Sequence, residues 1–197
     1  MREEGFHTLR FNSRGVGSST GWASFTGTKE GKDLEALVQW ALGHVTDVES
    51  VVLIVSCGHP RRIAFADDLH KGYSHGGLIA SLHPVLPNIK TSHVLLSYPL
   101  SPRGWITMFN SSTYQSQLEK LVQDDNSNVL VIYGDEDEFT SISKYRRWSG
   151  ELESKATDVE KFEIAGGTHF WRGRAGDEMQ QSVIGWLTAI TYSQFSK

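Results

Sequence analysis

The chain has 197 residues, a length typical of a single domain that buries a sizeable hydrophobic core. Its net charge of −4 argues against non-specific binding to nucleic acid or to an acidic membrane surface, which requires a strongly basic face. The single cysteine, Cys57, excludes a disulfide framework and a zinc-finger spacing. We therefore expect one domain over residues 1–197, with no metal ion and no cofactor.

The chain shows no targeting or membrane segment. Residues 1–5 are mostly charged or polar and lack the apolar core of a signal peptide. The longest apolar runs, such as Val51–Val55, are far shorter than the roughly 20 residues of a membrane helix. The sequence therefore predicts a cytoplasmic protein without a membrane span.

Short apolar segments alternate with segments of helical spacing along the chain. The predicted strands are Phe6–Phe11, Val51–Val55, His93–Ser97, Val129–Tyr133 and Lys161–Ala165. The predicted helices are Gly31–Leu42, Gly77–Leu82, Tyr114–Val122, Lys144–Lys155 and Asp177–Ile190. Continuously apolar strands are buried on both faces. The pattern thus predicts an α/β fold with a mostly parallel sheet and helices on both of its faces.

Residues 72–76 read Gly-Tyr-Ser-His-Gly and fit the pattern G-x-S-x-G. A nucleophilic serine on a tight strand-to-helix turn has strained backbone angles, so the residues two before and two after it must be very small. Here both are glycine, and a helical segment follows. Taken alone the pattern is weak, because short glycine-serine motifs also occur in ordinary turns.

Two later loops strengthen this interpretation. The strand Val129–Tyr133 runs into an acidic loop that contains Asp135 and Asp137, and the strand Lys161–Ala165 leads to His169. Either loop alone could be an ordinary solvated surface loop. In a parallel sheet, however, the carboxyl ends of the strands meet at one edge, where reactive groups gather. The order serine, acid, histidine is that of a Ser-Asp-His triad.

The sequence resembles the α/β-hydrolase superfamily. The resemblance rests on Arg10–Ser19, Gly72–Ser81, Leu95–Pro99, Val129–Phe139 and Gly166–Trp171, and covers most of the chain from about Gly5 onward. It implies that Ser74 is the nucleophile and His169 the general base. Asp137, three residues after Gly134, is then the acid that orients His169, with Asp135 as the alternative. The backbone N–H of His75 would supply half of the oxyanion hole.

The segment after the strand His93–Ser97 carries several large apolar side chains, among them Trp105, Met108 and Phe109. In the superfamily this region often forms a cap or a pocket wall. These residues are therefore candidates for substrate binding. The alternative is that the aromatic side chains pack against the body of the protein.

The sequence also departs from the superfamily. The resemblance makes Phe6–Phe11 the fourth strand of the sheet, so we expect the fold to be incomplete at the N-terminus and to lack the loop that carries the second oxyanion N–H. Sixteen residues, Ser56–Lys71, separate the strand Val51–Val55 from the G-x-S-x-G motif at residues 72–76 and have the character of an insert. Cys57, His59 and His70 fall within this insert, and we interpret them as incidental rather than as metal ligands.

The sequence therefore predicts a serine hydrolase that acts on a small-molecule ester or a related acyl substrate. Two alternatives stay open, a truncated hydrolase-like protein without catalytic activity and a binding module that uses the aromatic residues of the segment around Trp105. The identity of the substrate and the oligomeric state are not predicted.

Overall fold

The computed structural model describes residues 7–24, 26–55, 75–100, 111–156 and 158–195, apart from the side chains of residues 111 and 193–195. Its helices are α1 (Thr28–Leu42), α2 (His75–Leu82), α3 (Ser111–Gln123), α4 (Ile142–Lys155) and α5 (Gly173–Phe195). Its strands are β1 (Ser50–Ile54), β2 (Lys90–Leu96), β3 (Ser127–Gly134) and β4 (Val159–Ile164). The five predicted helices and four of the five predicted strands are confirmed in these ranges, with ends shifted by a few residues.

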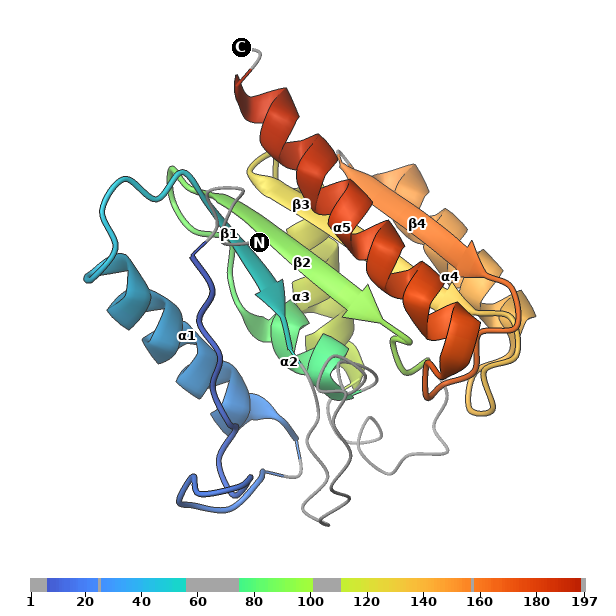
Figure 1. Cartoon of the computed structure of the whole chain (residues 1–197), viewed down its shortest axis with the longest axis horizontal. Coiled ribbons are helices and arrows are strands. Elements are labelled where there is room, and N and C mark those ends of the chain that lie inside the picture. The colour runs from blue at the N-terminus through green and yellow to red at the C-terminus, as the bar shows by residue number, and fades with distance from the viewer. Residues whose placement is uncertain (1–6, 25, 56–74, 101–110, 157, 196–197) are drawn as a thin grey trace.

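The strands form one sheet in the order β1-β2-β3-β4, and each neighbouring pair is parallel. All four therefore end at the same edge of the sheet (Figure 1). Every residue of β3 is buried, as the apolar run Val129–Tyr133 predicts for a central strand. The loops that follow β3 and β4 leave the sheet side by side, because these two strands are hydrogen-bonded neighbours.

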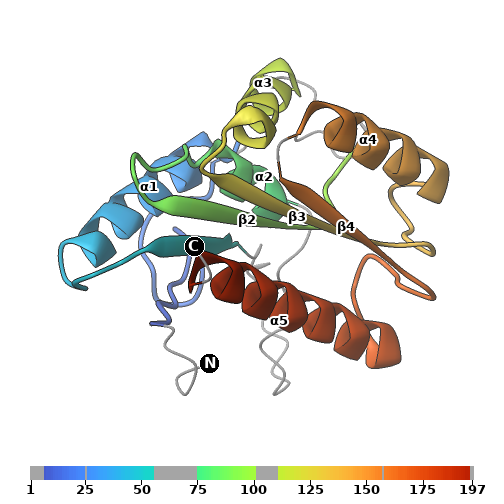
Figure 2. The same cartoon turned by 90° about the horizontal axis from the view of Figure 1, so that it is seen from above.

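Helices cover both faces of the sheet, which confirms the predicted α/β architecture. Helices α1 to α4 lie on one face and α5 lies alone on the other (Figure 2). Side chains alternate between the two layers, so that Leu95 and Val131 belong to the core under α1 to α4, while Val94 and Leu130 pack toward α5. Because both faces are covered, the middle of β3 and the end of β2 consist of consecutive apolar residues.

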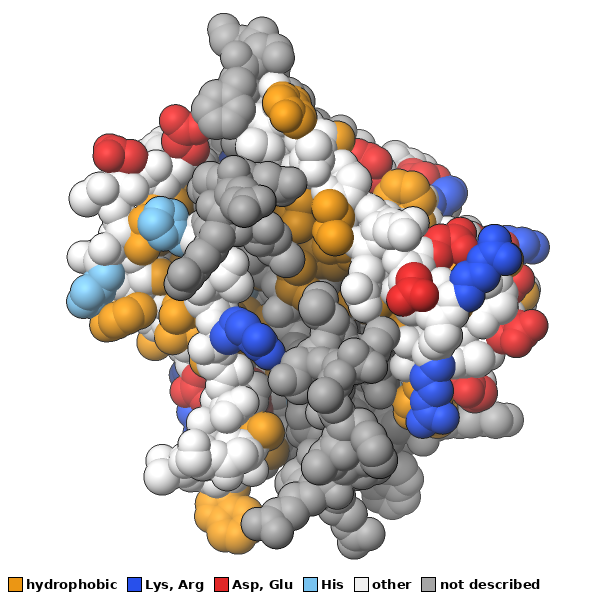
Figure 3. All heavy atoms as spheres, viewed as in Figure 1, with side chains coloured by type: hydrophobic (Ala, Val, Ile, Leu, Met, Phe, Trp, Pro, Cys, Tyr) orange, Lys and Arg blue, Asp and Glu red, His pale blue; other side chains and the backbone are white. Residues whose placement is uncertain are grey.

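The side of the molecule that carries α4 and β4 displays charges of both signs (Figure 3). Arg146 pairs with Glu163 at 2.6 Å, Lys155 pairs with Glu119 at 3.1 Å, and Lys161 pairs with Glu153. The side chains are at least partly exposed to water, so these pairs contribute little to stability. Among the described helices, none combines the length and the apolar character needed to cross a membrane.

The predicted strand Phe6–Phe11 is wrong for residues 7–11, which have no strand structure. Leu9 is 47% exposed and Phe11 is 41% exposed, so the alternation of apolar residues does not correspond to a buried face. A strand needs a neighbour for its backbone hydrogen bonds. Within the described residues, β1 is the first strand of the sheet and pairs only with β2.

A buried histidine lies in the middle of β2. His93 is completely buried, and its Nε2 donates to the backbone oxygen of His83 at 3.2 Å. Its Nδ1 has no hydrogen-bond partner in the described part of the chain. Protonation of Nδ1 would place a charge and an unpaired N–H in the core, and burial accordingly lowers the pKa of His93 to about 4.

We expect His93 to make the fold sensitive to acid. The unfolded chain binds this proton with a pKa near 6.5, so between about pH 6.5 and pH 4 the unfolded state holds more protons and stability falls as pH is lowered. Between pH 7 and pH 5 the loss from this one residue is about 2 kcal/mol. Urea denaturation at the two pH values measures it.

His93→Gln is the control, because glutamine retains an N–H donor and does not titrate. Its free energy of unfolding should vary less between pH 7 and pH 5 than that of the parent protein, by about 2 kcal/mol. An identical pH dependence in the two proteins would contradict the assignment.

Candidate functional site

Two loops meet at the carboxyl edge of the sheet. One follows β3 and contains Asp135 and Asp137, and the other follows β4 and contains His169. The backbone N–H of Glu136 donates to the oxygen of Gly167 at 3.0 Å and joins the two loops directly. Residues 31 or 32 positions apart in the sequence are thereby brought into hydrogen-bond distance.

A contact between two glycines makes this approach possible. A Cβ atom on Gly134 would lie 1.9 Å from the backbone oxygen of Gly167, and a Cβ on Gly167 would lie 2.8 Å from the Cα of Gly134. Neither position has room for a side chain, and the obstruction is backbone that cannot move aside. The pairing of the loops therefore requires glycine at both positions.

The carboxylate of Asp137 is buried and accepts four hydrogen bonds. The backbone N–H groups of Phe139 and Thr140 donate to Oδ1 at 2.8 and 2.9 Å. His169 Nδ1 lies 2.8 Å from Oδ2, and the hydroxyl of Tyr145 donates to the same oxygen at 3.1 Å. The side chain has 0% exposure, so these donors take the place of water.

These contacts favour the ionised form of Asp137. Burial alone raises the pKa of a carboxyl group, but the hydrogen bonds from His169, Thr140 and Phe139 outweigh burial and hold the pKa of Asp137 below its ordinary value. Asp137 therefore carries a negative charge at neutral pH and keeps the proton of the imidazole on Nδ1.

His169 is held at three points. Its Nδ1 bonds to Asp137, its backbone N–H donates to Glu138 Oε2 at 2.8 Å, and the ring of Phe139 meets its ring edge-on at a centroid distance of 4.6 Å. The side chain is only 6% exposed. An imidazole fixed through Nδ1 has Nε2 as its reactive nitrogen.

Asp135 takes a different position from Asp137. Its Oδ1 accepts the backbone N–H of Gly166 at 2.7 Å, and its side chain lies at the surface. The structure thus brings Asp137, and not the alternative Asp135, to His169.

His75 is the first residue of α2. Its backbone N–H belongs to the first turn, where N–H groups lack an acceptor within the helix. Its ring is partly buried, and Nε2 has no hydrogen-bond partner within the described residues. Burial lowers the pKa of His75, so the ring is neutral at neutral pH.

Several predicted features lie outside the described residues. These are Ser74, the substrate-binding candidates Trp105, Met108 and Phe109, and the segment Ser56–Lys71 with Cys57, His59 and His70. Tyr114, from the same aromatic-rich region, is buried in the core, and its hydroxyl donates to the backbone oxygen of Thr26. That residue packs against the body of the protein.

The sequence did not predict the surroundings of Asp137 and His169. Tyr145 shares a helical stripe with Trp148 and Leu152, so its burial could be predicted from the spacing of these residues, but its hydrogen bond to Asp137 could not.

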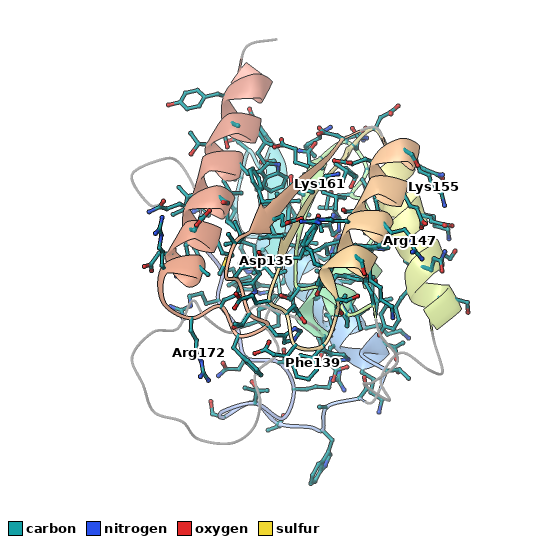
Figure 4. All side chains as sticks on the ribbon, turned by 90° about the vertical axis from the view of Figure 1, so that its right-hand side faces the viewer. Asp135, Phe139, Arg147, Lys155, Lys161 and Arg172 are labelled. Carbon is teal, nitrogen blue, oxygen red and sulfur yellow. The ribbon has the colours of Figure 1, made fainter. Side chains whose placement is uncertain are left out.

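Phe139 and Phe170 gave no sequence signal. They lie beside His169 and are 50% and 37% exposed. Figure 4 shows Phe139 and Arg172 in the lower half of the view, and the Arg172 guanidinium lies 5.6 Å from the Phe170 ring centre.

No protein-family model and no curated protein matches the sequence. Among solved structures, an α/β serine hydrolase homologue from Coxiella burnetii is 21% identical, with a TM-score of 0.60, over 89% of this chain and 67% of its own. An esterase from Pyrococcus furiosus is 19% identical, with a TM-score of 0.65, over 93% of this chain and 69% of its own.

An α/β-hydrolase enzyme from the sediment metagenome of the Mar Chica lagoon, Morocco, is 15% identical, with a TM-score of 0.51, over 84% of this chain and 71% of its own. These likenesses and the parallel sheet show that the chain has an α/β-hydrolase-like fold. The fold expected from the sequence is thereby confirmed.

The glycine contact leads to a prediction. Gly134→Ala forces its methyl group into the backbone of Gly167, so we expect a loss of about 2–3 kcal/mol in the free energy of unfolding. The separation of the two loops should also weaken the bond between Asp137 and His169. Urea denaturation measures the first effect, and the NMR resonance of the His169 Nδ1 proton reports the second.

Gly150→Ala is the matched control. A Cβ at Gly150, inside α4, meets no atom within 4 Å, so alanine should raise stability by about 0.5–1 kcal/mol through its better helix propensity. If Gly134→Ala were as stable as the parent protein, the two loops would not need the close backbone contact.

Proposed function

We propose that the protein is a serine hydrolase that cleaves a small-molecule ester or a related acyl substrate. The observation that carries this proposal is the buried hydrogen bond of 2.8 Å between Asp137 and His169 at the carboxyl edge of the sheet. Two structural neighbours support the class, since one is described as a serine hydrolase homologue and the other as an esterase. Ser74, one residue before α2, completes the proposed triad.

In the proposed mechanism, His169 Nε2 removes the proton of the Ser74 hydroxyl as its oxygen attacks the carbonyl carbon of the substrate. The imidazolium then returns the proton to the leaving alcohol, and an acyl-enzyme remains on Ser74. Water, deprotonated by the same imidazole, hydrolyses the acyl-enzyme and restores the serine. The backbone N–H of His75 donates to the oxyanion in both halves of the reaction.

Asp137 contributes to this mechanism by its charge and its position. Because its carboxylate is ionised and bonded to Nδ1, it orients the imidazole and stabilises the imidazolium that forms in the transition state. It need not accept the proton itself.

We expect a fluorophosphonate probe to label the parent protein and to leave Ser74→Ala unlabelled. The parent protein should hydrolyse p-nitrophenyl acetate, and Ser74→Ala and His169→Ala should each lower kcat by at least about 10³-fold. Equal labelling of the parent protein and Ser74→Ala would contradict the assignment of the nucleophile.

The two acidic residues provide an internal control. Asp137→Asn should lower kcat by about 10³–10⁴-fold, because the amide favours the wrong imidazole tautomer. Asp135→Asn should change kcat less than about threefold, since the side chain of Asp135, within the described residues, accepts only the backbone N–H of Gly166, which an amide oxygen can also accept. Absence of both labelling and turnover in the folded parent protein would favour a non-catalytic hydrolase-like protein. Binding of a ligand with equal affinity by Ser74→Ala would favour a binding module.

The exposed rings of Phe139 and Phe170 favour a substrate with an apolar group. They pack edge-to-face at 6.1 Å, and both contact the ring of His169. Large apolar side chains held at the surface beside a reactive histidine offer a surface for an acyl chain or an apolar alcohol.

Phe139→Ala should therefore discriminate between substrates. For p-nitrophenyl octanoate we expect kcat/KM to fall about tenfold, because the chain loses apolar contact, and for the acetate to fall by no more than about twofold. Ile184→Ala removes another exposed apolar side chain, on α5, and should affect neither ester. An equal loss on both esters would show that Phe139 supports His169 rather than the substrate.

A further inference from the structure

Tyr145 shares an acceptor atom with His169. Its hydroxyl donates to Asp137 Oδ2 at 3.1 Å, and His169 Nδ1 lies 2.8 Å from the same oxygen. The other carboxylate oxygen, Oδ1, is occupied by two backbone N–H groups. Each oxygen of Asp137 therefore has its own partners, and Tyr145 is the only described side chain besides His169 that bonds to this carboxylate.

The donor in this contact is defined by chemistry. An ionised carboxylate accepts hydrogen bonds only, and the pKa of Tyr145 is raised first by burial and then by the charge of Asp137. The phenol is therefore protonated at neutral pH, and it donates to Oδ2.

The ring of Tyr145 is held rigidly. It is fully buried and lies parallel to the ring of Tyr133, with centroids 4.8 Å apart and an interplanar angle of 6°. Tyr145 belongs to the first turns of α4 and Tyr133 to β3, so helix and strand together fix the hydroxyl. The hydroxyl of Tyr133 points to a different partner, Ser149 Oγ, at 3.3 Å.

We infer that Tyr145 is a positioning residue of the proposed triad, whose hydroxyl fixes Asp137 Oδ2 toward His169 and moderates the hydrogen bond between them. This inference rests on the proposed function. When two donors share one carboxylate oxygen, each of them forms a weaker hydrogen bond than a single donor would form. Without the hydroxyl, Oδ2 interacts with the imidazole alone but loses one of the contacts that hold it in place.

Two effects should follow in Tyr145→Phe, which keeps the ring and the stacking. Looser positioning should lower kcat about tenfold, while KM should stay within about twofold because Tyr145 is completely buried. The stronger interaction of Asp137 with the imidazolium moves the acidic limb of the pH–rate profile to higher pH. Among the described residues, three other carboxylates belong to the loop after β3: Asp135 accepts the backbone N–H of Gly166, Glu138 accepts that of His169, and Glu136 is exposed.

The experiment compares the parent protein, Tyr145→Phe and Tyr133→Phe. The two variants each remove one hydroxyl from the same stacked pair, and only Tyr145 reaches Asp137. We expect Tyr133→Phe to retain the kcat and pH profile of the parent protein. A change of the same size in both variants would assign Tyr145 a structural role only, and an unchanged profile in Tyr145→Phe would overturn the inference.

A measurement without substrate separates this inference from the proposed function. The NMR resonance of the His169 Nδ1 proton should move downfield in Tyr145→Phe, because its bond to Asp137 Oδ2 strengthens when the competing donor is removed. A shift in a protein that hydrolyses no ester would refute the proposed function and leave the coupling intact. A resonance identical to that of the parent protein would refute the coupling even in an active enzyme.

Discussion

The surroundings of the site depend on one buried charge, the carboxylate of Asp137. A carboxylate that is shielded from water is stable in its ionised form only if both of its oxygens accept hydrogen bonds from the protein. Here the loop after β3 supplies two backbone N–H groups, the loop after β4 supplies the imidazole of His169, and α4 supplies the hydroxyl of Tyr145. Three elements from different parts of the chain are thus fixed to one group, and the imidazole takes its orientation from them.

Backbone contacts bring the donors within reach of this carboxylate. Because β3 and β4 are parallel neighbours, their loops start together at one edge of the sheet. Gly134 and Gly167 then allow the two loops to approach more closely than any side chain permits. The parallel strands place the two loops next to each other. The close glycine contact then brings them near enough for the hydrogen bond of 2.8 Å between Asp137 and His169.

Much of the architecture could be predicted from the sequence, because burial on two faces leaves a strong local signal. The segments Val51–Val55 and Val129–Tyr133 are apolar at every position and became strands. The segment Phe6–Phe11 shows why such patterns fail elsewhere. Alternating apolar and polar residues indicate which side chains a strand could bury. A strand also needs a neighbouring strand for its hydrogen bonds, and the local sequence does not specify that neighbour.

The pairing of Asp137 with His169 was also expected, although Asp135 fitted the loop pattern as well. The choice between these carboxylates depends on the direction of two side chains after a turn. The backbone N–H of Gly166 donates to Asp135, whose side chain lies at the surface. The buried carboxylate of Asp137 accepts backbone N–H groups of its own loop instead.

By itself, the sequence determined the order of strands and helices, the α/β class and the residue types that gather where the strands end. These follow from periodicity and turn chemistry, which act over a few residues. Only the tertiary structure decided that Asp137 faces His169, that Tyr145 shares its oxygen, and that Phe139 and Phe170 flank the imidazole. Such contacts join segments far apart in the chain, and they are set by the packing of the whole fold rather than by local preference.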